Sequence, residues 1–308
     1  MKYLNELKEI VNGRILENEL MSKHTTYGVG GPTKAFINPK DRYDLARILK
    51  FSKEKNITTY FFGSGSNLLV SDHGIDGIVL SPNKSLKKLE IKNNLIFAES
   101  GVMLGKIVRE SIKKNLTGLE SLVGVPGTLG GALSMNAGAY GKEISNFLKS
   151  VNIMTMNGEI KKYNHKQIDF SYRFSNFKED EFILDANFNL KTDSSSDINT
   201  RKRKSSDSRK INQPLKFRSA GSVFKNDKKY SAGFLIDRVG LKGTRIGDAE
   251  ISPKHANFFI NHGCAKSSDI LKLISIARKR VYKEYKILLE LEIKVIGFKK
   301  NELESINV

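Results

Sequence analysis

The stretch that decides the fold runs from residue 124 to residue 141: Gly124-Val125-Pro126-Gly127-Thr128-Leu129-Gly130-Gly131-Ala132-Leu133-Ser134-Met135-Asn136-Ala137-Gly138-Ala139-Tyr140-Gly141. A helix that begins near Thr128 would present free backbone N–H groups and the positive end of its dipole to an anion. So many glycines are costly in ordinary packing, because each loses additional backbone entropy on folding. The stretch therefore predicts a ligand such as a pyrophosphate lying against the backbone.

A second glycine loop, residues 63–67 with the sequence Gly-Ser-Gly-Ser-Asn, follows a predicted helix over 41–55 and a predicted strand over 57–62. Such a loop can turn several N–H groups toward one anion. The G-x-G-x-x-G dinucleotide fingerprint fails here, because Leu68 takes the third glycine position and begins an apolar, strand-like run. Judged alone, the loop is equally well a tight turn between strands. Together with Gly28-Val29-Gly30-Gly31, the two loops favour a large diphosphate cofactor held by a fold other than the Rossmann fold.

The remaining pattern predicts an α+β protein. Helices and strands alternate in the first half, and a Ser/Asp/Asn/Thr-rich stretch over 191–199 suits a surface linker or the entry to an exposed helix. We place a domain boundary there. The second half is expected to hold a loop around Ser222, helices over 231–239 and 267–285, the latter capped by Ser267-Ser268-Asp269, and a final strand over 288–297 that may pack back on the first half.

Composition narrows the class of protein. At 308 residues, more than one domain is the default, and the formal charge of +19 predicts an anionic partner. The lysines are spread along the chain and no recognition-helix, zinc-finger or RNA-binding pattern occurs, so the basic run over 201–210 is predicted to be a solvated helix face. Cys264 is the only cysteine, no apolar run approaches a membrane span, and the first residues do not resemble a secretory signal. These features predict a cytoplasmic protein without a metal site or a membrane segment.

Eight motifs in order resemble one family, the UDP-N-acetylenolpyruvoylglucosamine reductases (MurB), from about Ser22 to Gly297. After the three glycine segments, the resemblance continues through Ser171-Tyr172-Arg173-Phe174-Ser175, Ser219-Ala220-Gly221-Ser222-Val223-Phe224-Lys225-Asn226, Ala232-Gly233-Phe234-Leu235-Ile236-Asp237, His255-Ala256-Asn257-Phe258 and the final stretch 289–297. The family's FAD-binding domain is of the type found in vanillyl-alcohol oxidase and p-cresol methylhydroxylase.

The resemblance implies an FAD-binding domain over 1–200, with two subdomains and a core of about 26–191, and a smaller α+β substrate-binding domain over 201–308. It implies non-covalently bound FAD, NADPH as co-substrate, and reduction of UDP-N-acetylglucosamine enolpyruvate to UDP-N-acetylmuramate in peptidoglycan precursor synthesis, hence a part in cell shape and division. A cytoplasmic monomer is expected. The expected cofactor-binding residues are Gly28, Gly30, Gly63, Ser64, Gly65, Ser66, Asn67, Leu68, Gly127, Thr128, Gly130, Gly131, Asn136, Ala137 and Gly138, and the expected substrate-binding residues are Lys210, Asn226 and His255.

The resemblance also assigns three catalytic residues. Arg173 would grip the enolpyruvyl carboxylate with two parallel N–H bonds and oppose the charge as it spreads into an enolate. Glu292 would donate a hydrogen bond to that enolate if burial raised its pKa. Glu290 shares its face of the predicted strand, so the residues alone leave the two open, and the family register favours Glu292. Ser222 would deliver the proton to the second carbon, backed by positive charge such as that of Lys225.

Three features qualify the resemblance. Some members carry a loop whose tyrosine covers the substrate, but no tyrosine occurs between Asp185 and Ser222, so this chain is predicted to be the shorter form. Arg218 and Asp227 stand where prolines are expected, which puts the rigidity of the loop around Ser222 in doubt.

Two other functions were weighed. An FAD oxidase of the same fold acting on a small alcohol would reoxidise quickly in air. A basic nucleic-acid-binding protein would be colourless and would bind duplex DNA with a steep salt dependence.

Overall fold

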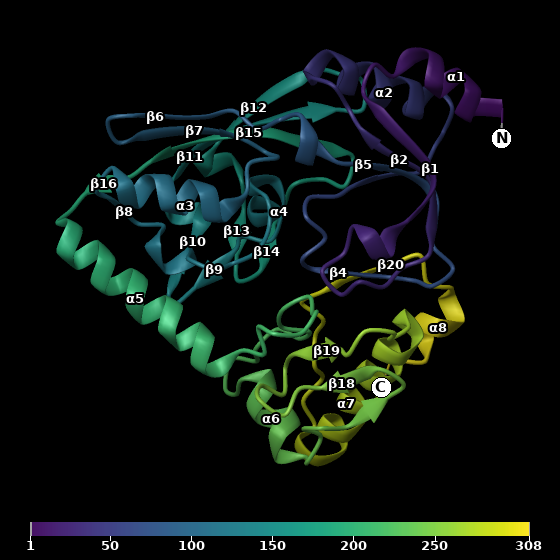
Figure 1. The fold of residues 1–308 in the computed structure, drawn as a ribbon, viewed down its shortest axis with the longest axis vertical. Helices are drawn as coiled ribbons and strands as arrows, with labels where there is room; N and C mark the ends of the chain where they lie inside the picture. The colour runs from purple at the N-terminus through teal and green to yellow at the C-terminus, as the bar shows by residue number, and fades with distance from the viewer. Residues whose placement is uncertain (1, 308) are drawn as a thin grey trace. The chain divides into compact units, whose positions relative to one another are not determined.

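The computed structural model describes residues 2–307 and divides them into two compact units, each built from separate stretches of the chain (Figure 1). The first unit takes the chain up to Glu17, then Ala35–Ser64 and Gly77–Arg209; the second takes Asn18–Lys34, Gly65–Asp76 and the chain from Lys210 onward. The predicted domains, 1–200 and 201–308, stay a prediction. The compact units part between Arg209 and Lys210, and two early segments belong with the C-terminal part.

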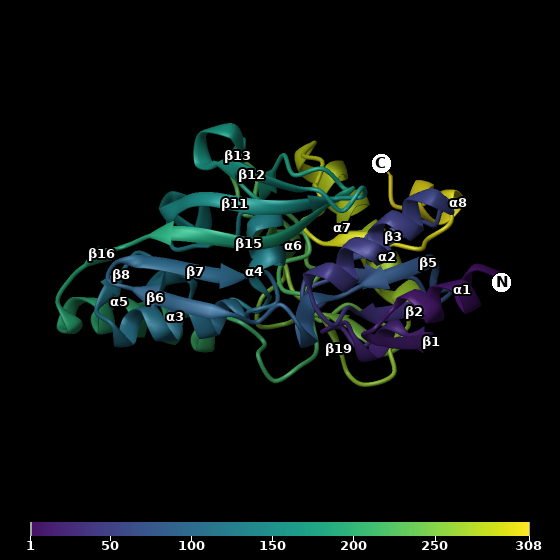
Figure 2. The same ribbon diagram turned by 90° about the horizontal axis from the view of Figure 1, so that it is seen from above.

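The larger sheet of the first unit consists of β6 (Leu89–Lys92), β7 (Leu95–Glu99), β11 (Leu148–Thr155), β12 (Ile160–Asn164) and β15 (Glu181–Asn189). Its antiparallel order is β12-β11-β15-β7-β6, and Figure 2 shows the last four of these strands side by side. Side chains of β15 reach two cores, and a register shift at Leu184 in the pairing with β11 interrupts their two-residue alternation. Ile183 and Phe188 pack with α3 (Leu104–Lys113) and α4 (Leu129–Ser134), whereas Phe182 and Leu184 pack with the N-terminal helices.

The smaller sheet has the order β1-β2-β5-β3, with β1 at Arg14–Leu20, β2 at Pro32–Asn38, β3 at Thr59–Phe61 and β5 at Ile75–Leu80. Helices α1 (Lys2–Ile10) and α2 (Arg42–Glu54) supply Leu7 and Ile48 to the core that contains Ile37. The predicted helix over 41–55 is confirmed: Asp41 caps α2 by accepting a 2.9 Å hydrogen bond from Asp44 N.

Three short pairs complete the sheets of the first unit, and α5 (Ser195–Asn212) begins in it. The stretch over 191–199 is indeed the entry to an exposed helix. Its basic face is only partly solvated, which corrects the prediction for 201–210: Arg201 is bonded to carboxylates and Arg209 is half-buried. The pairs are β8 (Leu116–Thr117) with β16 (Lys191–Thr192), β9 (Gly138–Ala139) with β10 (Lys142–Glu143), and β13 (Phe170–Ser171) with β14 (Phe174–Ser175).

The second unit surrounds a single apolar cluster. It contains β4 (Leu68–Val70), α6 (Ala232–Arg238), the sheet β17-β18-β19 (Arg245–Ile246, Ala249–Ile251, Phe259–Asn261), α7 (Ser267–Tyr285), β20 (Lys294–Ile296) and α8 (Lys300–Glu304). Both predicted helices are confirmed, and Ile236 of α6 packs with Ile274 of α7. The parallel pairing of β20 with β4 confirms that the end of the chain returns to its first half.

One local prediction is wrong and another is confirmed in part. The strand expected over 288–297 is regular only in β20, and before it a single bridge joins Leu291 to Phe224. The N-terminus of α7 is capped by Asp269, which accepts from Lys266 N at 3.0 Å, and by Asp72, whose carboxylate accepts from Ser267 N at 2.8 Å. Of the predicted cap Ser267-Ser268-Asp269, Asp269 is therefore confirmed, whereas the Ser267 hydroxyl oxygen accepts from Asp72 N at 2.7 Å.

Within residues 2–307, no helix is both long and apolar enough to cross a membrane.

Candidate active site

The Gly63 end of the first glycine loop lies against the start of α4, within the first unit. A Cβ on Gly63 would lie 2.3 Å from Thr128 Oγ1, so only glycine fits this position. The carbonyl of Gly63 accepts a 2.8 Å hydrogen bond from Asn83 Nδ2. The two glycine segments found in the sequence therefore meet, and Ser64 continues the bend.

Buried hydroxyl groups gather at the same place. The side chains of Thr128, Ser81 and Ser100 are at most 1% exposed, and among the described residues their hydroxyl oxygens have no hydrogen-bond partner. A buried hydroxyl without a partner costs about 1–3 kcal/mol, so such groups call for a ligand or ordered water. Ser100 is tied to the glycine segment because its carbonyl accepts from Gly130 N at 3.0 Å. This cradle suits a ligand rich in hydrogen-bonding oxygens and nitrogens, such as a flavin dinucleotide.

The N-terminus of α4 corrects one prediction. Its first N–H groups are not free: Leu129 N donates to Val102 O at 2.8 Å, and Gly130 N donates to Ser100 O. Gly127 also uses its carbonyl, which accepts from Leu104 N at 2.9 Å, and Gly131 lies in the first turn of the helix. Hydrogen bonds to a ligand at this segment would therefore come from the hydroxyl groups of Thr128, Ser81 and Ser100 more than from the N-terminus of α4.

The rest of the first glycine loop belongs to the second unit. Gly65 has φ +66°, and a Cβ there would lie 2.0 Å from His24 O; its carbonyl accepts from Thr26 N at 3.1 Å. Ser66 and Asn67 form the turn into β4, which begins at Leu68, and Asn67 Nδ2 donates to Glu292 O at 3.0 Å. Close packing explains these glycines without a ligand.

Gly28 and Gly30, in the second unit, both have a positive φ, a backbone conformation that favours glycine. A Cβ on Gly28, at φ +69°, would lie 2.1 Å from Arg218 Nη1, and one on Gly30, at φ +126°, would lie 2.9 Å from Val70 Cβ. Arg218 is one of the two departures from the expected prolines. It leaves the loop tethered, because Asn261 N donates to Arg218 O at 2.9 Å. At the other departure, Asp227 accepts a hydrogen bond from Lys229 N at 2.9 Å, so the backbone after Asn226 is held by a local turn.

Arg173 is placed by a two-residue turn between β13 and β14. Its φ is +57°, a left-handed conformation that is uncommon outside glycine. Asn136 fixes this hairpin: its Nδ2 donates to Ser171 O at 3.0 Å and to Glu143 Oε2 at 2.7 Å. Both N–H groups of the Asn136 amide are thus used, and both backbone groups of Ala137 are bonded within the chain. Gly138 lies beside the arginine, since a Cβ there would lie 3.2 Å from Arg173 Nη1.

Ser222 and Glu292 lie on adjacent segments of the second unit. Ser222 forms a bridge with Phe258, and Glu292 N donates to the carbonyl of the next residue, Val223, at 2.8 Å. Asn257 secures the Ser222 loop from its other side, accepting from Phe224 N at 2.9 Å and donating to Phe224 O at 2.8 Å. Both Ser222 and Glu292 are half-buried.

Glu290, the alternative to Glu292, faces elsewhere. Its side chain is 72% exposed and pairs with Lys225 at 3.5 Å. The premise that the two glutamates share one strand face is wrong, because the chain bends at Glu292 and is not a strand there. This geometry favours Glu292. Lys225 is paired with Glu290 on the same surface.

The predicted substrate residues are dispersed within the second unit. Lys210 lines a cavity of about 430 Å³ with Lys216 and Phe217, but Asn226 and His255 do not line it. Asn226 Oδ1 accepts from Ala232 N at 3.0 Å, next to the start of α6. His255 Nδ1 accepts from Asn257 N at 3.2 Å, which leaves Nε2 to carry the proton of the neutral ring. Burial lowers the pKa of His255, and Lys242 adds to the effect.

Arg173 belongs to the first unit, and Ser222 and Glu292 belong to the second. Their convergence on one ligand stays a prediction. Within residues 2–307, no group of three or more His, Cys, Asp or Glu side chains is placed to hold a metal.

Sequence reasoning missed three residues of the first unit. Ser81 and Ser100 each directly follow a strand, β5 and β7, and small polar residues at strand ends could have suggested them. Arg209 was read as part of a solvated basic face. Its guanidinium lies 6.0 Å from the centroid of the Tyr140 ring, and Gly124, at φ +76°, leaves room for its aliphatic stem.

Two family models match the chain. An FAD binding domain matches residues 33–164, which include the cradle around Thr128, and the C-terminal domain of UDP-N-acetylenolpyruvoylglucosamine reductase matches residues 213–296. With the fold, these matches define an FAD-dependent oxidoreductase that has a separate C-terminal domain.

Named relatives extend over nearly the whole chain. UDP-N-acetylenolpyruvoylglucosamine reductases of Clostridium novyi (strain NT) and Clostridium kluyveri are each 41% identical to it, over 92% of both chains and 96% of both chains respectively. The crystal structure of the enzyme from Thermus caldophilus is 34% identical, with a TM-score of 0.79, and covers 92% of this chain and 100% of its own. The chain belongs to the UDP-N-acetylenolpyruvoylglucosamine reductase (MurB) family. The predicted family, fold class and FAD dependence are confirmed.

Proposed function

We propose that this chain catalyses the reaction for which its relatives are named, the NADPH-dependent reduction of UDP-N-acetylenolpyruvoylglucosamine. The product is UDP-N-acetylmuramate, a precursor of peptidoglycan. FAD, when bound, supplies the hydride chemistry between NADPH and the terminal carbon of the enolpyruvyl group. In the first unit, Thr128, Ser81 and Ser100 would hold it through their buried hydroxyl groups.

Arg173 and Glu292 would stabilise the intermediate. Addition of hydride to the terminal carbon leaves negative charge on the carbon that bears the carboxylate. Arg173 would bind that carboxylate through two N–H groups, and the Glu292 carboxyl, if protonated, would donate a hydrogen bond to the developing enolate oxygen. The exposed Lys225–Glu290 pair supports Glu292 as the acid over its neighbour.

Ser222 would complete the reaction by giving its hydroxyl proton to the second carbon. The observation that carries this assignment is the 2.8 Å hydrogen bond from Glu292 N to Val223 O, which sets Ser222 and Glu292 on adjacent segments. A proton donor and an enolate-stabilising acid must both reach the same three-carbon group, so neighbouring backbone positions suit the pair.

A Ser222→Ala variant tests the proposal by separating the two half-reactions. Bleaching of the flavin absorbance by NADPH should keep its wild-type rate, because no proton from Ser222 enters that step. Anaerobic reoxidation by the enolpyruvyl substrate should slow by about 10²- to 10⁴-fold, the usual contribution of a positioned acid. Stopped-flow absorbance measures both rates.

Ser219→Ala, in the same loop, is the matched control and should leave both rates unchanged. Fast reoxidation of Ser222→Ala would show that another group delivers the proton. A wild-type protein that lacks flavin, or that is reoxidised by air and not by the substrate, would contradict the proposed function itself.

We also propose a cytoplasmic location and a monomeric state. The support for the location is the use of NADPH and the presence of one unpaired cysteine, Cys264, which suits a reducing compartment. Light scattering of the FAD-loaded protein checks the monomer.

A further inference from the structure

Two guanidinium groups of the first unit lie against one short segment, residues 138–140. Gly138 is beside Arg173, since a Cβ there would come within 3.2 Å of Nη1, and two residues later the Tyr140 ring lies 6.0 Å from Arg209 Cζ. Tyr140 has φ +51°, so this segment turns in a conformation that few non-glycine residues adopt. The two cations are therefore brought together by a specific local geometry.

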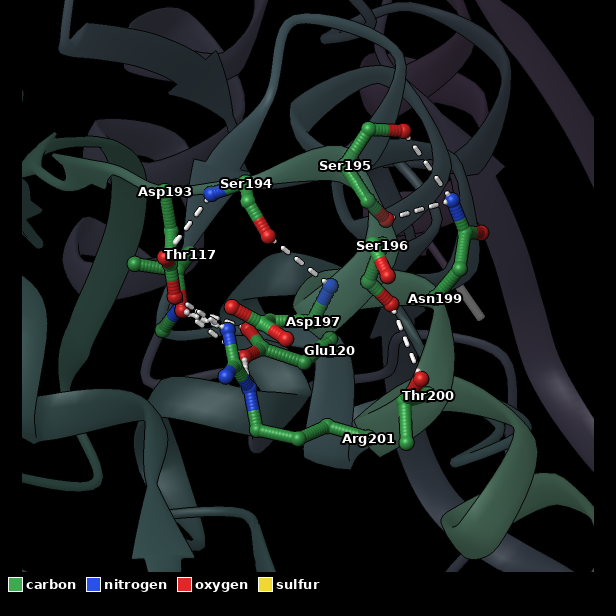
Figure 3. A network of polar contacts seen from close by, with 11 residues as sticks. Thr117, Glu120, Asp193, Ser194, Ser195, Ser196, Asp197, Asn199, Thr200 and Arg201 are labelled. Carbon is green, nitrogen blue, oxygen red and sulfur yellow. Dashed lines mark hydrogen bonds and ion pairs between the residues drawn. The ribbon is translucent and has the colours of Figure 1, made fainter.

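Polar contacts, more than apolar packing, hold the helix that carries Arg209. In α5 only Ile198 and Ser205 are buried. Arg201 anchors the helix: its Nε donates to Glu120 Oε1 at 2.7 Å and its Nη2 donates to Asp193 Oδ2 at 2.6 Å (Figure 3). One turn later, the Tyr140 hydroxyl donates to Ser205 O at 3.1 Å.

Glu120 ties this anchor to the turn that precedes the glycine-rich stretch. Its carboxylate accepts from Gly118 N at 2.5 Å and from Thr117 Oγ1 at 2.8 Å, in addition to Arg201 (Figure 3). Burial acts to raise the pKa of Glu120, but these hydrogen bonds outweigh it and lower the pKa, so the carboxylate is charged at neutral pH. Because Arg201 and Arg209 lie on the same helix, the bonds of Arg201 to Glu120 and Asp193 also fix the position of Arg209.

The electrostatics of the pair favour an anion. Burial lowers the pKa of Arg209, Tyr140 opposes this shift, and the positive charge of Arg173 adds to it. Two like charges on one small surface repel each other, and an anion bound between them would relieve the repulsion. The Arg209 guanidinium lies near the Tyr140 ring, and its planar fork of N–H groups matches the two oxygens of a carboxylate.

We propose that Arg209 acts with Arg173 as a paired-guanidinium site that binds the carboxylate of the enolpyruvyl group. The inference rests on the proposed function. It adds a second cation to the single arginine that the sequence indicated, and it gives α5 and its Arg201–Glu120 anchor the task of positioning that cation.

Equilibrium binding tests the inference with two probes. UDP-N-acetylenolpyruvoylglucosamine carries the carboxylate, whereas UDP-N-acetylglucosamine carries the same nucleotide and sugar without it. Titration of the oxidised flavin absorbance should show that Arg209→Ala weakens binding of the first probe about 10- to 100-fold, the range for a lost charged hydrogen bond. Binding of the second probe should stay unchanged, and Arg209→Lys should give an intermediate loss, because it keeps the charge without the fork.

Arg203→Ala is the matched control, an exposed cation on the same helix, and it should bind both probes as the wild type does. An equal loss for the two probes would overturn the carboxylate assignment, and so would no loss for either. If Arg209→Ala does not retain FAD, the binding of both probes is measured with Arg209→Lys instead. A loss for the carboxylate-bearing probe alone supports the inference, and an equal loss or no loss overturns it. Substrate-dependent oxidation of NADPH by the wild type, measured first, separates a failure of this inference from a failure of the proposed function.

Discussion

At the scale of single residues, His255 shows how a turn decides a protonation state. Its Nδ1 accepts from the Asn257 backbone, and burial with the nearby charge of Lys242 lowers the pKa of the ring. A histidine whose pKa is depressed on folding binds its proton more tightly in the unfolded chain. Unfolding therefore takes up a proton as soon as the pH falls below the unfolded value of about 6.5.

We accordingly expect His255 to make the protein less stable as the pH falls below about 6.5, with no contribution above that value. Urea unfolding of the wild type and of His255→Gln, followed across this range, measures the effect. The difference in unfolding free energy between the two should change in favour of the variant as the pH falls. A pH-independent difference would mean that the ring titrates normally in the folded protein.

The residues of the candidate site were predictable to different degrees. Gly63 and Thr128 were predictable because each lies in a glycine-rich segment that is easily recognised in the sequence. The structure brings the two residues together. Ser81 and Ser100 carry only a weak signal, that of a small polar residue directly after a strand, and the burial of their hydroxyl groups without a partner is visible only in the structure. The left-handed turn at Arg173 depends on Asn136, which is distant in the sequence, so no local pattern announces it.

At the scale of elements, Arg42 joins a helix to a pair of strands. In the pairing of β15 with β7, Asp185 lies directly opposite Glu99, which places two carboxylates side by side. Arg42, at the start of α2, contacts both, at 2.9 Å each. Burial raises the pKa of Asp185, and Arg42 acts against this shift, so the carboxylate depends on the arginine.

Replacing Arg42 by methionine, which keeps the aliphatic stem, should destabilise the protein by about 2–3 kcal/mol at neutral pH, because two facing carboxylates are left without their cation. The loss should be smaller at acidic than at neutral pH, because the raised pKa of Asp185 favours protonation, which relieves the repulsion. Chemical denaturation at the two pH values measures this. Arg47→Met is the control: the Arg47 side chain is 47% exposed, and its buried partner Asp44 keeps its hydrogen bonds from Asn12 N and Lys40 N, so the loss should be smaller, about 1 kcal/mol. An equal loss at both pH values would indicate lost packing instead of lost charge.

The helices were more predictable than the strands because their signals are local. The apolar period over 267–285 predicted the bounds of α7, and its local cap residue Asp269 could be seen in the sequence, whereas the second cap, Asp72, is almost two hundred residues away. The last strand was overestimated for the same reason. Its apolar residue Val295 pairs with Leu69, whereas Leu291 forms a bridge with Phe224, and a period of two cannot tell a continuous strand from a bent one.

At the scale of the whole molecule, the division into units could not have been read from composition. The second unit includes Asn18–Lys34 and Gly65–Asp76, although both precede most of the first unit in the sequence. A shift in composition marks a linker, but here the chain moves between units inside strands such as β1 and β5. The net charge of the chain, in contrast, follows directly from its sequence. It affects both stability and the attraction of charged substrates, and no single pair of residues controls these effects.

A net charge of +19 on 308 residues repels itself in the compact state and attracts anionic substrates from solution. Salt screens both interactions, so raising the ionic strength should raise the melting temperature of the FAD-loaded protein while lowering kcat/KM for NADPH and for the UDP-linked substrate. Sodium and potassium chloride should act alike on the melting temperature, because screening depends on ionic strength alone. Differential scanning fluorimetry and steady-state assays over the same salt series give both signs. A melting temperature that falls with added salt would show that attractive ion pairs outweigh the net repulsion, and a difference between the two cations would reveal a specific cation site in place of general screening.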